Sequence, residues 1–110
     1  MTRTRDEILE SRRLKAEYGT LFDLVSALLY RHDPIGINFE ESTDEYDLEA
    51  RTILPKLRRC NALQDVHDAV YSEFVHWFDA DTAGPREHYN EIASEIWQLW
   101  QEYLARNPTA

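Results

Sequence analysis

The sequence predicts an all-α fold, a single-domain antiparallel bundle of four core helices preceded by an N-terminal helical arm. Several segments repeat apolar residues every three or four positions, as the buried face of a helix does. No sustained apolar–polar alternation typical of a strand is present, and 110 residues are enough for one domain but too few for two cores. We therefore expect an arm at residues 1–18, the bundle at 19–106 and a tail at 107–110.

The segment from Tyr89 to Leu104 has the clearest helical pattern. Its apolar side chains fall on one arc roughly 160° wide, which is too wide for a two-stranded coiled coil and indicates a core helix between neighbours. Gly84-Pro85 is expected to open this helix, with proline at the first helical position. If the arm leaves Trp97 and Leu104 uncovered at the edge of the arc, they form an exposed patch.

A second helix is predicted from about Leu63 to Phe78, with Asn61 as its N-cap and a loop from Asp79 to Gly84. Together with the last helix it supplies most of the aromatic side chains. These are expected at the centre of the core: Phe74, Trp77, Phe78, Tyr89, Trp97, Trp100 and Tyr103.

Upstream, Ser42 and Glu45 have the spacing of a capping box and predict the start of a third helix. Pro55 should kink or divide that helix, because proline removes the hydrogen bond to Arg51. Cys60 falls on its apolar side, where a thiol usually packs as an inert group.

The remaining core helix is predicted from Leu21 to His32. It should end at Asp33-Pro34-Ile35-Gly36, because the residue before a proline avoids the helical region. The arm before Gly19 is charge-dense, so we expect it to be helical but poorly buried.

The charge balance excludes some partners. Twelve Lys and Arg against 21 Asp and Glu give a formal net charge of −9, which repels nucleic acid and anionic lipid surfaces and attracts basic proteins. No segment has the ~20 apolar residues of a membrane span. A single cysteine and an N-terminus without an apolar signal region predict a cytoplasmic protein.

The four histidines are the first candidates for metal ligands or proton carriers. His67 projects from the apolar face of its helix and His32 ends the apolar face of another, so each is expected to be a hydrogen-bonded core group, with a pH-sensitive or metal-binding role as the alternative. Glu73 and His76 have the Glu-x-x-His spacing of di-iron bundles, but the motif occurs once and should face water. His88 is likewise placed on a solvent side, and no metal site is predicted.

Carboxylates are concentrated between Asp33 and Glu49, without the spacing of a calcium loop. No motif for nucleophilic catalysis or phosphate binding occurs, so we predict neither catalytic residues nor a cofactor. Asp33 is expected to face the turn from Asp44 to Asp47, with Tyr46 packed beneath, as a structural latch first and a binding surface second. The candidate binding residues are Asp33, Glu40, Glu41, Asp44, Tyr46 and Asp47.

Two short motifs carry a family resemblance. The Asp33-Pro34-Ile35-Gly36 turn followed by Asp44-Glu45-Tyr46-Asp47 resembles a widespread group of short bacterial helical domains of unknown function, over roughly Leu21 to Leu104. The resemblance implies a compact helical fold in a bacterial cytosol. It implies no activity.

The leading functional hypothesis is a non-enzymatic protein-interaction domain, immunity-like or regulatory, that offers its carboxylate face to a basic protein. The alternative is a metal- or small-ligand-binding helical enzyme that uses His67, His32 and nearby carboxylates. A monomer is expected, or a weak homodimer formed through the arm and the edge of the last helix.

Overall fold

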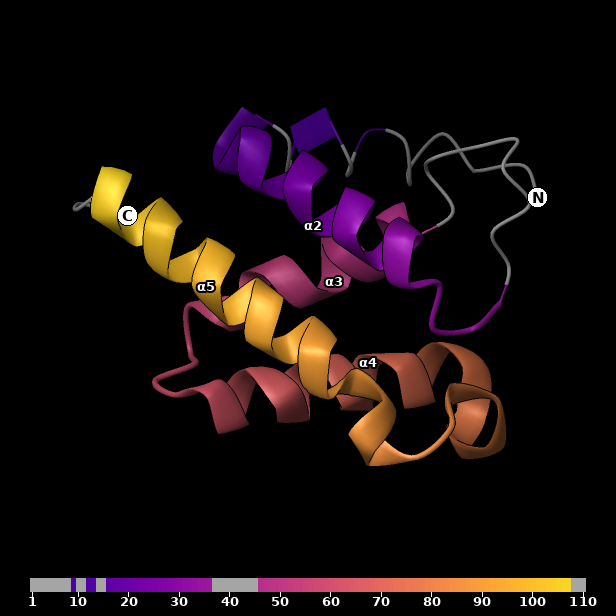
Figure 1. Ribbon diagram of the computed structural model, residues 1–110. Coiled ribbons are helices and arrows are strands. Elements are labelled where there is room, and N and C mark those ends of the chain that lie inside the picture. Colours follow the sequence, from indigo (N-terminus) through magenta and orange to yellow (C-terminus); the bar gives the residue numbers. More distant parts are fainter. Residues whose placement is uncertain (1–8, 10–11, 14–15, 37–45, 108–110) are drawn as a thin grey trace.

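The computed structural model describes residues 9, 12–13, 16–36 and 46–107, and this part of the chain is all-α (Figure 1). Its main helices are α2 (Thr20–His32), α3 (Asp47–Leu57), α4 (Leu63–Ala83) and α5 (Asn90–Arg106), with the short 3₁₀ helix η1 (Arg86–Tyr89) before α5. The predicted fold class is therefore confirmed.

The four long helices form a closed ring of neighbours. α2 packs on α3, α3 on α4, α4 on α5, and α5 returns to α2. Successive helices run in opposite directions, and α5 crosses the molecule from the α4 side to α2 (Figure 1). The large side chains that close the centre of the ring are fully buried: Phe22, Leu29, Tyr46, Ile53, Leu54, Leu57, Phe74, Tyr89, Ile92 and Ile96.

α2 ends where the Asp-Pro pair predicts. Asp33 adopts the left-handed region at φ 46° and ψ 57°, and its amide donates to the Leu29 carbonyl at 2.8 Å. Aspartate adopts this conformation more readily than most residues other than glycine, because its short polar side chain can form local hydrogen bonds. The chain then turns, with the Gly36 amide donating to the Asp33 carbonyl at 3.1 Å.

α3 is not divided at Pro55. The helix continues from Asp47 to Leu57, so the proline stands in its last turn and removes only a hydrogen bond close to the natural end. The predicted extension towards Cys60 is wrong by about one turn. The capping box at Ser42 and Glu45 lies outside the described residues.

α4 differs from prediction at both ends. Its N-cap is Ala62 rather than Asn61, whose amide instead donates to Asp65 Oδ2 at 2.9 Å. The loop expected after Phe78 is a further helical turn, separated from the main helix by Asp79 at φ 71° and ψ 167°. Asp79 Oδ1 accepts from the Thr82 amide at 2.9 Å and so caps that turn.

α5 begins later than predicted. Pro85 is the extended residue before η1, and one 3₁₀ turn intervenes before α5 starts at Asn90. Within α5 the predicted apolar face is the buried one, with Ile92, Ile96 and Trp100 inward. Trp97 and Leu104 are half-buried against the core.

One other expectation about exposure is wrong. Trp77, expected at the centre of the core, is 38% exposed, and its indole N–H donates to Thr52 Oγ1 at 3.4 Å. In the arm the described positions are helical and Leu9 is 51% exposed, whereas Tyr18 is buried against Tyr103. Over the described ranges, no helix combines the length and apolarity needed to cross a membrane.

Candidate functional site

The predicted meeting of Asp33 and Tyr46 is present. The Tyr46 hydroxyl donates to Asp33 Oδ1 at 2.6 Å and accepts a hydrogen bond from the Ile35 amide at 3.2 Å. Its ring is fully buried and packs 6.1 Å from that of Phe74. The phenol thus joins the turn after α2 to the start of α3.

Asp47 belongs to the same junction. Its carboxylate accepts a hydrogen bond from the Ser26 hydroxyl of α2. Because Asp33, Tyr46 and Asp47 all make contacts inside the protein, these three candidates act as a structural latch between α2 and α3. The other candidates, Glu40, Glu41 and Asp44, lie outside the described residues.

His32, at the end of α2, contacts α5. Its Nε2 and Glu95 of α5 form a hydrogen bond, and Arg31 donates to the same carboxylate at 2.8 Å. Through these two contacts the Glu95 carboxylate ties the C-terminal end of α2 to α5. It brings one carboxylate to His32, fewer ligands than a metal site needs.

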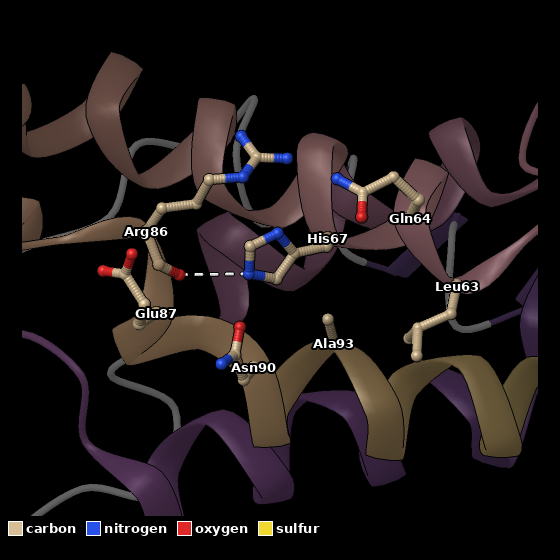
Figure 2. Close-up of a pocket in the computed structure, with 7 residues that line it drawn as sticks. All are labelled: Leu63, Gln64, His67, Arg86, Glu87, Asn90 and Ala93. Atoms are coloured by element: carbon tan, nitrogen blue, oxygen red, sulfur yellow. Dashed lines mark hydrogen bonds between the residues drawn. The ribbon is translucent and has the colours of Figure 1, made fainter.

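His67 lies in a hollow of about 300 Å³ between the start of α4 and the η1–α5 junction (Figure 2). We call this cavity the His67 hollow. Its lining residues are Leu63, Gln64, His67, Arg86, Glu87, Asn90 and Ala93. The imidazole is 9% exposed, and its Nε2 donates to the Arg86 carbonyl at 3.0 Å. The expected hydrogen-bonded core histidine is therefore observed, with a backbone carbonyl as its partner.

That bond determines the tautomer of neutral His67. Since a carbonyl oxygen only accepts, the proton is on Nε2 and Nδ1 is an acceptor, which Figure 2 shows on the side of the ring away from the Arg86 carbonyl. The Arg86 guanidinium beside the ring is already paired with Asp68 and lies over Tyr71. The hollow therefore offers an imidazole acceptor, the amide groups of Gln64 and Asn90 and the Glu87 carboxylate, and its arginine is already paired with Asp68.

The two residues of the Glu-x-x-His motif, which were both expected to face water, lie in different environments. Glu73 is 7% exposed and forms an ion pair with Lys56 of α3, while His76 is exposed. His88, though exposed as predicted, reaches across the fold and donates from Nε2 to the Pro34 carbonyl at 3.0 Å. Across the described part of the chain, no group of three His, Cys, Asp or Glu side chains is placed to hold a metal ion.

Cys60 packs as predicted for an inert thiol. It is half-buried and its S–H donates to the Lys56 carbonyl at 3.4 Å. Burial, with a smaller contribution from Asp65, raises the pKa of the thiol. A raised thiol pKa leaves little thiolate at neutral pH, which is unfavourable for nucleophilic chemistry.

A second hollow lies between α2 and α5 and was not predicted from the sequence. This α2–α5 groove, of about 260 Å³, is lined by Leu24, Ala27, Leu28 and Arg31 from α2 and by Glu95, Gln98, Leu99 and Glu102 from α5. Leu24 is 42% exposed at its edge. Leu24 belongs to the helix predicted from Leu21 to His32, but its exposure depends on how α2 and α5 pack and could not be predicted from helical spacing.

Acidic side chains follow the outer face of α5. Glu91, Glu95 and Glu102, which we call the acidic row, are separated by about one and two helical turns and so point in one direction. Glu91 and Glu102 are exposed, and the Glu95 side chain is 43% exposed. The row runs along the same side of α5 as the groove.

No protein-family model, curated protein or solved structure matches this chain.

Proposed function

We propose that this chain is a non-enzymatic protein-interaction domain, immunity-like or regulatory, that binds a basic protein in the cytoplasm. The observation that carries the proposal is the acidic row beside an open groove. Within the described part of the chain, Arg31 and His32 contact Glu95 of the row, and no basic side chain is found against Glu91 or Glu102. Glu91 and Glu102 are exposed and available to Lys or Arg of a partner.

The overall charge supports this reading. At −9 the field of the whole chain speeds the encounter with a basic surface and repels nucleic acid. We propose that the binding surface lies on α5 and not at the predicted 33–47 turn, because Asp33 and Asp47 form hydrogen bonds that hold α2 and α3 together. We propose a monomer, since the groove and row need no second copy.

The test compares two double variants with the same change in net charge. Glu91→Gln/Glu102→Gln removes two charges of the acidic row, and Asp79→Asn/Asp81→Asn removes two exposed charges at the far end of α4. Asparagine keeps the side-chain oxygen that caps Thr82, so the control should fold normally.

Tagged wild-type protein and both variants are used to capture proteins from lysate at low and high salt, with identification by mass spectrometry. We expect basic partners that are lost at high salt and reduced by the Glu91/Glu102 change alone. Recovery of no partner, of partners indifferent to salt, or of equal amounts with both variants would overturn the proposal.

One observation favours the alternative of a small-ligand site. The His67 hollow contains an imidazole acceptor that has no hydrogen-bond partner among the described residues. An enzyme that uses His67 and His32 with a metal would carry a stoichiometric ion, which elemental analysis of the purified protein would detect. Such an ion would displace the interaction domain as the preferred function.

A further inference from the structure

The two walls of the α2–α5 groove have the same spacing. Leu24, Ala27, Leu28 and Arg31 stand at positions i, i+3, i+4 and i+7 of α2, and Glu95, Gln98, Leu99 and Glu102 repeat these positions on α5. Each wall therefore presents one helix face over two turns, about 10 Å long. A channel of this shape between two helices matches the ridge of side chains on a third helix.

The groove has an apolar base. Leu28 is buried and Leu99 half-buried, and both line the groove together with Leu24, which is more exposed. Ala27 is exposed and short, which leaves room for an entering side chain. An apolar side chain of a partner that enters here removes leucine surface from water, which is favourable.

The edge of the groove is acidic. The α5 wall carries Glu95 and Glu102, and the only cation in the lining, Arg31, already donates to Glu95 at 2.8 Å. Glu102 is exposed, and among the described residues its carboxylate accepts a hydrogen bond from the Gln98 amide at 3.4 Å. Charge complementarity therefore favours a partner with Lys or Arg beside its apolar residues and disfavours an acidic one.

We propose that the α2–α5 groove binds a short amphipathic helix of the basic partner. Apolar side chains spaced i, i+3 or i+4, and i+7 enter the groove, and flanking lysines or arginines contact Glu102 and the acidic row. This is the helix-in-groove mode of recognition. The proposal rests on the proposed function, because it specifies how the basic protein is held.

The probe is a fluorescein-labelled helical peptide of leucine and lysine, with leucine on one face at the spacing given above. It is titrated into the full-length protein and followed by fluorescence anisotropy. Two further peptides serve as controls, one with glutamate in place of lysine and one of the same composition with the leucines scattered around the helix.

Two variants alter the groove and one is a matched control. Leu24→Gln removes apolar surface at the edge, and Ala27→Trp fills the channel. Leu63→Gln changes a leucine with the same 42% exposure at the start of α4, which is not among the residues that line the groove. All three positions are exposed or at an edge, and circular dichroism confirms that each variant is folded.

We expect the leucine–lysine peptide to bind wild type and Leu63→Gln alike, and to bind Leu24→Gln and Ala27→Trp at least about tenfold more weakly, as the loss of one buried leucine contact implies. The glutamate and scattered peptides should bind far more weakly. Methyl resonances of Leu24, Leu28 and Leu99 should shift during the titration.

Other occupants give different results and would overturn the proposal. Nuclear Overhauser contacts from residues 1–18 of the free protein to the Leu24 and Leu99 methyls would mean that the chain's own arm fills the groove. A doubled solution mass that Leu24→Gln abolishes would mean that a second copy does. Equal peptide affinity in all variants would exclude the groove. The proposed function would survive that result if the Glu91/Glu102 variant still loses its basic partners.

Discussion

The Tyr46 hydroxyl donates a hydrogen bond of 2.6 Å to Asp33 Oδ1, and so joins the residue that ends α2 to the residue that precedes α3. The same oxygen accepts from the Ile35 amide at 3.2 Å. A phenol that both donates and accepts in a buried position satisfies groups that would otherwise be unpaired.

Tyr46→Phe should therefore destabilise the protein by about 1–2 kcal/mol, because it leaves the Ile35 amide and a carboxylate oxygen without this partner. Urea unfolding measures the change. Tyr71→Phe is the matched control, since no hydrogen bond of the Tyr71 hydroxyl is found within the described residues, and a similar loss in both variants would contradict the prediction.

The effects on stability of changing Glu73, which is buried, and Lys56, which is partly exposed, should be coupled. Lys56→Met leaves the Glu73 carboxylate without its cation and should cost about 1–2 kcal/mol, less than a fully buried pair because 43% of the Lys56 side chain is exposed. Adding Glu73→Gln should recover part of that loss. If the double variant loses the sum of the two single losses, the residues are not coupled.

Alkaline pH should weaken the fold through Tyr89. Burial, with a smaller contribution from Tyr71, raises the pKa of Tyr89 to about 12, and its hydroxyl donates to the Ala83 carbonyl at 2.6 Å. The folded state then holds a proton that the unfolded chain has released, so this contribution is complete below about pH 10 and is lost as pH rises towards about 12. Urea unfolding across that range should show a shallower decline for Tyr89→Phe than for wild type. Parallel declines would show that another group is responsible.

Gly84 should resist substitution for a backbone reason. It adopts φ 83° and ψ −172° between α4 and η1, a region that only glycine enters without strain. No atom lies within 4 Å of an added Cβ, so steric contact contributes nothing. Gly84→Ala should therefore cost about 1–3 kcal/mol, measured by chemical denaturation, and an unchanged midpoint would contradict the backbone argument.

Helical periodicity was sufficient to predict the main helices and their buried faces, because the pattern along α5 or α2 depends on local spacing alone. The contact between Asp33 and Tyr46 was expected on another ground, the two short motifs of the 33–36 turn and the start of the next helix. Three of the six predicted binding residues, Asp33, Tyr46 and Asp47, proved to have internal structural contacts.

The features that periodicity missed depend on which helices become neighbours. Glu73 was expected to face water, but α3 packs beside it and Lys56 of α3 forms an ion pair with its carboxylate. Leu24 lies in a helix predicted to belong to the core, but α2 and α5 leave a groove beside it and its side chain is exposed there. The break at Asp79 arises because its side chain caps the following turn, a local bond that competes with helix continuation.

The bonds around Tyr46 and His88 have a use for protein engineering. Ile35 is held by Tyr46 at one side of residues 37–45, the Pro34 carbonyl by His88, and Asp47 by Ser26 at the other side. The described residues on either side of 37–45 are therefore anchored to the bundle. Since the entropic cost of lengthening a connection grows slowly, by about 0.6 kcal/mol for each doubling, a reporter sequence inserted between Gly36 and Tyr46 should cost little as long as these anchors hold.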